Sequence, residues 1–183
     1  CHRIRIRNER DVESPRRRQR IQLAEAAAAD HADDLVARAH QPATDELPDR
    51  TALGYLEVDG GWRSNVFHLP VRGSGDGGIY TTVADIRSLW SAFFAGRIVS
   101  PEWVAEMVRP RSDVPAHSSR YGLGFWLHAS TDVVILEGMD AGVSFRSMHD
   151  PRSDTTSTVV SNTTDGAWPV ARYLTELHDS AGI

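Results

Sequence analysis

The stretch GSGDGGIYTTVADIRSLW, residues 73–90, joins a glycine-rich turn to the start of an amphipathic helix. Thr82 and Asp85 have the spacing of a capping box, in which two side chains bond backbone N–H groups at the helix N-terminus. Gly96 follows the last apolar positions and is a typical helix terminator. Between these ends, apolar residues recur every three or four positions, which predicts a helix packed against a core: Val83, Ile86, Leu89, Trp90, Phe93 and Phe94.

The glycines before this helix have two interpretations. Gly73, Gly75 and Gly78 fit G-x-G-x-x-G, the pattern that brings backbone N–H groups against a dinucleotide pyrophosphate. In that motif the third glycine lies where the helix begins, whereas here residues 79–81 separate Gly78 from the cap. The alternation of strands and helices that builds a parallel sheet does not follow either. The pattern therefore favours a structural turn, in which glycines adopt positive φ without a ligand.

The sequence on both sides of this stretch predicts an α+β fold with an antiparallel sheet packed against helices. Two extended segments precede the stretch, and Ser100 and Pro101 begin a second helix after it. Short polar links then separate four strand-like runs, as antiparallel neighbours require. The predicted elements are extended segments 52–58 and 65–71 around a turn at 59–61, the second helix up to Pro110, strands 122–128, 132–137, 143–149 and 155–162, and a helix from about residue 165 to 179.

Composition limits the class of protein. With 40% hydrophobic and 25% charged residues, the 183-residue chain is typical of a globular protein. Residues 1–20 carry a net charge of +5 and the remaining residues −10, so the folded part disfavours a nucleic-acid partner. No apolar run reaches the roughly 18 residues of a membrane span, and no signal-peptide pattern follows the basic start. Lysine is absent, which excludes Schiff-base lysines, P-loops and Ser-x-x-Lys nucleophiles within these residues.

The first fifty residues differ from the rest. Residues 1–20 form a basic segment, interpreted either as an arm for nucleic acid or anionic membrane or as a disordered tail. Residues 21–39 are rich in Ala, Leu, Glu and Arg and predict a helix that buries little. A proline-marked linker follows. We therefore divide the chain into a segment over residues 1–44 and a domain over residues 45–183. The start at Cys1 indicates either a processed chain or a fragment of a longer protein, and we favour the fragment.

The polar residues contain no complete catalytic or metal motif. The eight histidines lack the H-x-x-x-H and H-E-x-x-H spacings of zinc sites, and a single Cys excludes a cysteine-based one, so we expect no metal or other cofactor. The sequence also lacks the G-x-S-x-G elbow of many serine hydrolases. A Ser-His-Asp triad would have to assemble from distant positions: Ser74, Ser144, His68, His128, His149, Asp76 and Asp140.

A series of motifs in fixed order carries a resemblance to a known family. The series comprises a Gly-Gly turn and capped helix within residues 75–110, YGLGFWL at 121–127, EGMDAGVSFRS at 137–147 and TVVSNT at 158–163. Over about residues 45–180, the chain resembles the C-terminal portion of the serine beta-lactamase-like family. That family includes class C beta-lactamases, D-Ala-D-Ala carboxypeptidases and related esterases. The resemblance implies a partial beta-lactamase/transpeptidase-like fold.

The resemblance also implies where a catalytic site would lie. In the family a Ser-x-x-Lys serine is acylated, a Tyr-x-Asn motif assists proton transfer, and a third motif lines the acyl pocket. The first two motifs do not occur here, since the chain has no lysine and no tyrosine followed two residues later by Asn. The third corresponds to Asp140, Ala141 and Gly142, with the Val143 N–H as oxyanion donor. Asp140 replaces the usual Lys or His and so removes positive charge.

The resemblance also implies which residues shape the pocket, and two classes of function remain open. The scaffold candidates are Gly77, Gly78 and Tyr121. The first function is the C-terminal part of a serine hydrolase for small acyl substrates (beta-lactam, peptide or ester), inactive alone because the nucleophile is missing. The alternative is a non-catalytic binding or interaction domain, in which the loop of residues 73–78 and the Asp140 region line a pocket without chemistry; a basic nucleic-acid module ranks last. Residues 138–142 also have a purely structural interpretation, as a tight strand connection. A partial fold also predicts an exposed sheet edge that pairs with another chain.

Overall fold

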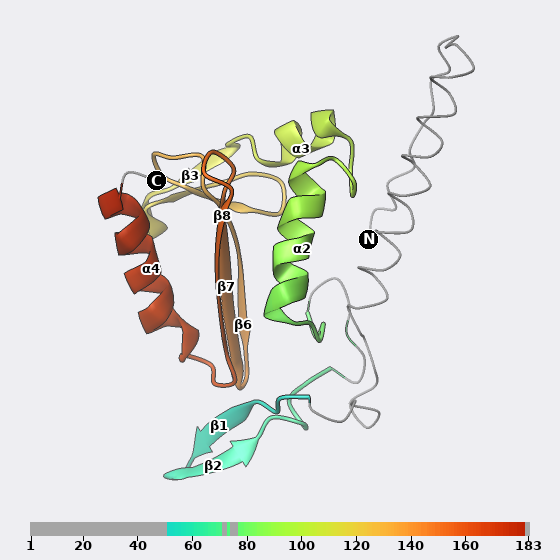
Figure 1. Ribbon diagram of the computed structural model, residues 1–183. Coiled ribbons are helices and arrows are strands. Elements are labelled where there is room, and N and C mark those ends of the chain that lie inside the picture. Colours follow the sequence, from blue (N-terminus) through green and yellow to red (C-terminus); the bar gives the residue numbers. More distant parts are fainter. Residues whose placement is uncertain (1–50, 71–72, 74–76, 182–183) are drawn as a thin grey trace, which may run out of the picture.

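The computed structural model of the chain describes residues 51–70, 73 and 77–181 (Figure 1). The predicted basic segment, Ala-rich helix and linker lie outside the described residues. Within the described part, no helix is both long and apolar enough to cross a membrane. The elements in chain order are β1 (Tyr55–Val58), β2 (Gly61–Ser64), α2 (Val83–Phe94), α3 (Pro101–Met107), β3 (Ser112–Val114), the 3-10 helix η1 (Pro115–His117), β4 (Ser119–Tyr121), β5 (Trp126–His128), β6 (Val134–Asp140), β7 (Val143–Asp150), β8 (Thr155–Ser161) and α4 (Ala167–Ala181).

Six strands form one antiparallel sheet in the order β3-β4-β5-β6-β7-β8, and β1 pairs with β2 in a separate hairpin. Each strand of the large sheet pairs with the next one along the chain. The longest ladders join β6 to β7 and β7 to β8, with seven residue pairs in each. The predicted α+β fold with an antiparallel sheet is therefore confirmed.

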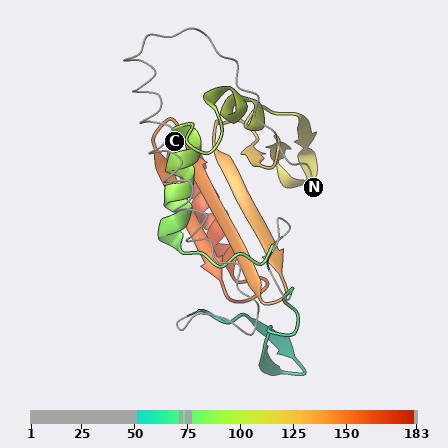
Figure 2. The ribbon, with the colours of Figure 1, turned by 90° about the vertical axis from the view of Figure 1, so that its right-hand side faces the viewer.

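Helix α2 covers one face of the large sheet and α4 covers the other (Figures 1 and 2). Two separate cores result, because successive side chains of a strand point to opposite faces. In β6, for example, Val134 packs toward α2 and its neighbour Ile135 toward α4. The core under α2 contains Ile86, Trp90, Leu127 and Val134, and the core under α4 contains Val133, Ile135 and Met148, with Leu174 packed against them.

Helix α2 begins as its sequence predicts. The Thr82 hydroxyl accepts the Asp85 N–H at 3.1 Å, and the Asp85 carboxylate accepts the Thr82 N–H at 3.3 Å, so the capping box is complete. Ile86, Trp90 and Phe93 are buried, as the apolar stripe predicts. Val83, the first residue of the helix, is the exception because its side chain is 54% exposed.

One predicted strand is shorter than its apolar pattern indicated, and the prediction of an extended segment from residue 65 is wrong over residues 65–70. The run 122–128 is a strand only over β5, since Gly122 packs so tightly on Met107 that a Cβ would lie 2.2 Å from the Met107 carbonyl oxygen. Gly124 then adopts φ of +87°, which interrupts an extended backbone. Residues 65–70 form no strand, and β2 pairs with β1 before them. Asn65 follows β2, and its N–H still bonds Gly54 next to β1, but its side chain bonds Ala141 and its carbonyl accepts the His68 N–H in a turn.

Candidate functional site

The candidates for the third motif form a two-residue turn between β6 and β7. Asp140 ends β6 and pairs with Val143 at the start of β7, while Ala141 and Gly142 make the turn. Gly142 has φ of 76°, which glycine adopts without strain. The Ala141 N–H donates to the Asp140 carboxylate at 2.6 Å, and the Gly142 N–H donates to the Thr164 hydroxyl at 2.9 Å. In this conformation both of these N–H groups therefore have protein partners.

Asn65 fastens the β1–β2 hairpin to this turn. Its side chain is 2% exposed. The Asn65 Nδ2 donates to the Ala141 carbonyl at 2.8 Å, and its Oδ1 accepts the Gly54 N–H at 3.2 Å. The Asn65 N–H donates in turn to the Gly54 carbonyl at 2.9 Å. We call these contacts the Asn65 clamp; the bond to Ala141 joins positions that are 76 residues apart in the sequence, and the bonds to Gly54 join positions 11 residues apart.

A second set of bonds ties β7 and the turn to the segment between β8 and α4. Ser144, the second residue of β7, is completely buried. Its hydroxyl donates to the Thr163 carbonyl at 2.8 Å and accepts the N–H of Ala167, the first residue of α4, at 3.0 Å. The Thr164 hydroxyl holds the Gly142 N–H. The turn is thus held on one side by the Asn65 clamp and on the other by the segment that leads into α4.

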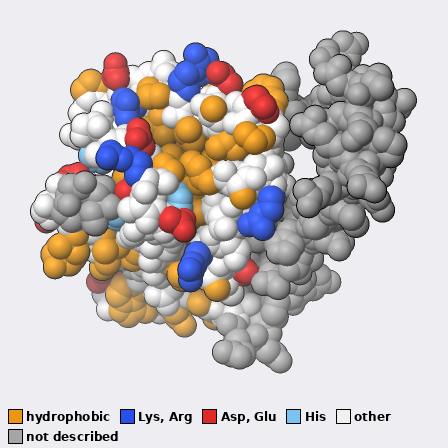
Figure 3. Space-filling view, turned by 45° about the horizontal axis from the view of Figure 1, so that its top comes forward, with side chains coloured by type: hydrophobic (Ala, Val, Ile, Leu, Met, Phe, Trp, Pro, Cys, Tyr) orange, Lys and Arg blue, Asp and Glu red, His pale blue; other side chains and the backbone are white. Residues whose placement is uncertain are grey.

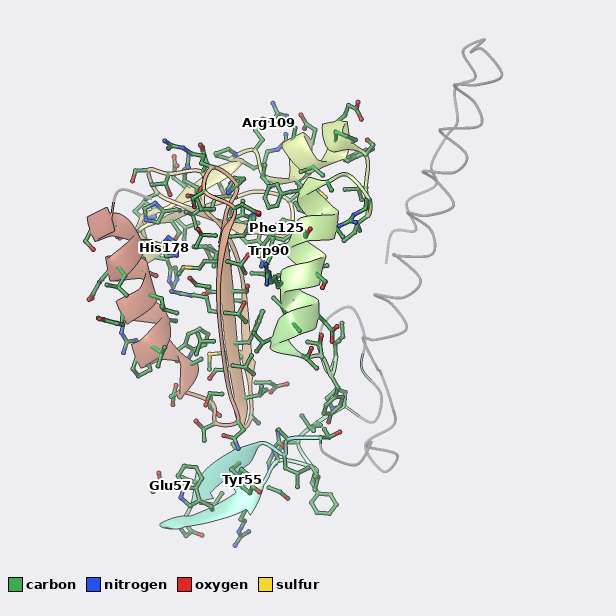
Figure 4. All side chains as sticks on the ribbon, in the orientation of Figure 1. Tyr55, Glu57, Trp90, Arg109, Phe125 and His178 are labelled. Carbon is green, nitrogen blue, oxygen red and sulfur yellow. The ribbon has the colours of Figure 1, made fainter. Side chains whose placement is uncertain are left out.

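An open hollow of about 310 Å³ lies beside the turn and is lined by Tyr55, Trp62 and Thr163. Tyr55 adjoins Gly142, since a Cβ on Gly142 would lie 3.0 Å from the Tyr55 nitrogen. The Trp62 side chain is 64% exposed, and Glu57 pairs with Trp62 across the hairpin. Figure 4 shows Tyr55 and Glu57 on β1, beyond the end of the large sheet. The hollow is shallow and open, so it presents an exposed apolar surface next to the turn.

The structure does not bring all the predicted scaffold residues to this turn. Gly78 has φ of +84°, and a Cβ there would lie 2.9 Å from Gly73 Cα, so the loop closes on itself at this glycine. Gly77, its neighbour, is exposed. Tyr121 lies on β4 and packs edge-on against Trp126 at 4.9 Å between ring centroids. Because Trp126 pairs with Ile135, five residues before the end of β6, Tyr121 lies away from the turn.

Ser74 and Asp76, two of the triad candidates, lie outside the described residues. Four of the other candidates are bonded to other groups: Ser144, His128, His149 and Asp140, whose carboxylate accepts the Ala141 N–H. The Ser144 hydroxyl contacts only backbone groups, and His128 pairs with Asp179 at 3.1 Å. His149 Nδ1 bonds the Thr156 hydroxyl at 2.9 Å. Among the described residues there is also no group of three or more His, Cys, Asp or Glu side chains suited to a metal ion. The features left as a candidate site are therefore the β6–β7 turn and the hollow beside it.

Two titratable groups at the far end of β7 are perturbed by their surroundings. Burial lowers the pKa of His149, while the nearby carboxylates of Asp154 and Asp150 act in the opposite direction and raise it. Burial alone would raise the pKa of Asp150. Hydrogen bonds from the Arg152 N–H and the Ser153 hydroxyl, together with the charge of Arg152, lower the pKa of Asp150 overall. Both groups lie at the opposite end of β7 from the turn, so they belong to the core and not to the hollow.

Asn65 and Thr164 are the residues of this site that the sequence patterns did not reveal. Each bonds a backbone group of the β6–β7 turn from a distant segment. Local periodicity carries no information about such long-range partners. The nearest signal was the last motif of the series, residues 158–163, which ends one position before Thr164.

No protein-family model and no curated protein matches the chain. Among solved structures, it is similar to a penicillin binding protein from Bacillus halodurans, with 31% identity and a TM-score of 0.70. That match covers 76% of this chain and 44% of the Bacillus halodurans protein. The octameric penicillin-binding protein homologue from Pyrococcus abyssi is 19% identical with a TM-score of 0.55, over 66% of this chain and 28% of that one. A D-stereospecific amidohydrolase from Streptomyces sp. is 16% identical with a TM-score of 0.53, over 69% of this chain and 38% of that one.

The fold of the described residues is therefore the beta-lactamase/transpeptidase-like fold. The comparison at 31% identity confirms the resemblance seen in the sequence and identifies the chain as a relative of penicillin-binding proteins within the serine beta-lactamase-like family. The chain spans less than half the length of each of the three structures.

Proposed function

We propose that this chain forms the side of a beta-lactamase-like serine hydrolase that lines the acyl pocket, with the β6–β7 turn as its third motif. The observation that carries the proposal is the fixation of that turn from two directions, by the Asn65 clamp and by the Thr164 hydroxyl on Gly142. Donors that stabilise an oxyanion work best when they are fixed before the reaction, because no reorganisation is then needed. The likeness to a penicillin binding protein supports the same function.

In this proposal each part of the site has a role. The Val143 N–H is the oxyanion donor, since it follows the turn directly. The hollow formed by Tyr55, Trp62 and Thr163 takes an apolar substituent of the acyl group. Asp140 stands where the family carries a cation, so its carboxylate repels anionic substrates when it is ionised. Neutral ester or amide substrates fit this charge better than penicillin-type carboxylates do.

The nucleophile is supplied, in this proposal, by polypeptide outside these residues. The 183 residues contain no lysine, so they hold no Ser-x-x-Lys motif. The Ser144 hydroxyl is engaged by two backbone groups and has no base beside it. Acyl transfer needs both an activated nucleophile and the oxyanion site. The chain by itself is therefore expected to bind acyl compounds weakly and not to turn them over.

A serine-directed fluorophosphonate probe, a chromogenic beta-lactam and a short-chain nitrophenyl ester test this function. The purified chain should show no labelling and no hydrolysis above the buffer rate. Mixed or co-expressed with the part of the Bacillus halodurans penicillin binding protein outside the matched region, it should yield a labelled serine on that part. Labelling of the 183-residue chain alone would overturn the proposal.

A non-catalytic binding domain is the second candidate, and the open hollow favours it. Its three lining residues include two aromatic side chains but no group that could act as nucleophile and base together. An uncharged aryl amide such as benzamide would then raise the melting temperature with no turnover in any combination of polypeptides. Turnover in the co-expressed complex would exclude this candidate.

A further inference from the structure

One face of the β1–β2 hairpin combines two aromatic rings with a carboxylate. Asp59 and Gly60 form its turn with φ of 53° and 75°, the positive values that a tight two-residue hairpin turn requires, and this turn fixes the register. Glu57 therefore lies directly opposite Trp62. Tyr55 is two residues before Glu57 on the same strand, so all three side chains project from one face. We call Tyr55, Glu57 and Trp62 the hairpin face.

The two rings of the hairpin face are close enough to contact one ligand. Tyr55 and Trp62 are diagonal neighbours across the two strands, and such neighbours lie within reach of each other when the side chains are aromatic. Both rings line the same hollow, together with Thr163. Both residues are exposed, so a ligand can reach them from solvent.

Glu57 differs from other carboxylates of the chain, because it has no cationic partner. Glu106 accepts a hydrogen bond from Arg109 at 2.7 Å, and Glu137 accepts one from Arg146 at 2.6 Å. Acidic and basic side chains also lie close together over the upper part of the surface in Figure 3. Within the described part of the chain, by contrast, no hydrogen bond or ion pair engages the exposed Glu57 side chain.

The hairpin itself does not neutralise this carboxylate. Its basic residue, Arg63, pairs with Leu56. Since successive side chains of a strand alternate between faces, Arg63 projects from the face opposite to Trp62 and Glu57. The hairpin face therefore presents a negative charge beside two aromatic rings.

This combination favours an organic cation as the ligand. A carboxylate attracts positive charge, and the faces of aromatic rings attract cations as well. A divalent metal ion usually needs several oxygen ligands, and the described residues hold no group of three or more suitable side chains. A guanidinium group fits best, because it is planar, stacks on aromatic rings and bonds a carboxylate with two N–H groups. The methylene stem of an arginine side chain also packs on apolar surface.

We infer that the hairpin face binds an arginine side chain of a separate peptide, with the stem against Tyr55 and Trp62 and the guanidinium group on Glu57. The hairpin face adjoins the β6–β7 turn, since a Cβ on Gly142 would lie 3.0 Å from the Tyr55 nitrogen. The arginine stem is then the substituent that the proposed function places in the hollow. In this assignment to a substrate the inference rests on the proposed function, whereas binding of arginine does not require hydrolysis.

Titration of the full 183-residue chain with Nα-acetyl-arginine methylamide, followed by ligand-detected NMR, tests the inference. Nα-acetyl-citrulline methylamide is the matched control ligand, because its urea group has the shape of guanidinium without the charge. The arginine compound should bind at least about threefold more tightly, as expected for exposed cation–aromatic and ion-pair contacts. Equal binding of the two compounds would overturn the inference.

Variants of the chain locate the site. Glu57→Gln keeps the size of the side chain but removes its charge, so it should weaken binding of the arginine compound by about threefold and leave citrulline binding unchanged. Trp62→Ala should weaken binding of both compounds. Trp103→Ala is the control, since Trp103 is an exposed tryptophan on α3, and it should change neither. Unchanged arginine binding by Glu57→Gln would contradict the assignment, even if Trp62→Ala failed to fold.

The basic segment of the chain offers a competing occupant, because residues 1–20 contain eight arginines. Binding of the arginine compound that appears only after these eight residues are changed to Gln would assign the site to the chain's own segment and overturn the assignment to a separate peptide. Equal binding before and after that change would support the inference. Arginine binding without hydrolysis in any combination of polypeptides would keep this site and contradict the proposed hydrolase alone.

Discussion

The indole ring of Trp90 and the imidazole ring of His149 stack with 5.7 Å between centroids and 14° between planes. Phe94 stacks on the same imidazole at 4.7 Å. His149 is 3% exposed, and its Nδ1 bonds the Thr156 hydroxyl. A charged imidazolium between these rings would lose its hydration, and burial accordingly lowers the pKa of His149. The core under α2 therefore contains a histidine that is held neutral.

Acidification should destabilise the fold through His149. In the unfolded chain this group binds a proton below about pH 6.5, whereas the folded state resists protonation. The unfolded state thus binds more protons, and stability falls as the pH drops below that value. Thermal melts should show a lower melting temperature at pH 5.5 than at pH 7.5. In His149→Asn this difference should be smaller; an unchanged difference would show that other groups cause it.

Trp90→Phe should destabilise the protein by about 1–2 kcal/mol. The Trp90 Nε1 donates to the Ser147 hydroxyl at 2.8 Å in a fully buried position, and the Ser147 hydroxyl also bonds Thr158. Phenylalanine keeps most of the packing but leaves Ser147 without this donor. Urea unfolding followed by circular dichroism measures the change. Trp103→Phe, on the exposed surface of α3, should have almost no effect.

Removal of the Asn65 clamp should loosen the β1–β2 hairpin. Asn65→Ala leaves the Gly54 N–H and the Ala141 carbonyl without their partner, at a cost of about 1–3 kcal/mol. Amide exchange in β1 and β2 should become faster. Asn162→Ala is the control, because that exposed amide makes a bond of 3.3 Å to the Leu53 carbonyl at the surface. Equal effects of the two variants would show that the clamp has no special role.

Gly142→Ala should distort the turn. A methyl group there would lie 2.9 Å from the Asn65 Cβ, and the φ of +76° disfavours any side chain. We expect a loss of at least about 1 kcal/mol, read as a lower melting temperature. Gly138→Ala lies in the same β6–β7 hairpin with open space around the site and should cost much less. A Gly142→Ala variant as stable as Gly138→Ala would contradict the tight packing of the turn.

Elements with strong local signals were predictable from the sequence. The capping box of Thr82 and Asp85 specified the start of α2, and the β6, β7 and β8 strands fall where their apolar runs indicated. These features depend on residues close together in the sequence. The order of motifs was also sufficient to suggest the family, which the likeness to solved structures confirms.

Features that depend on tertiary contacts were not predictable in this way. The run 122–128 reads as a continuous strand, yet the approach of Gly122 to Met107 bends it. Asn65 reads as the start of a strand, yet its amide is used to join the hairpin to Ala141. The separation of Tyr121 from Asp140 follows from strand register. In each case the residue that determines the conformation lies on another element. The residue pattern along a single segment does not reveal which residue that is.

The Asn65 clamp has a consequence for biosynthesis. Asn65 leaves the ribosome 76 residues before Ala141, its partner in the turn. At about 5–20 residues per second, the hairpin waits roughly 4–15 s for that turn to be made. Until Ala141 is made, the Asn65 amide has no partner in the turn. One of the first described elements to be synthesised is thus among the last to reach its final place.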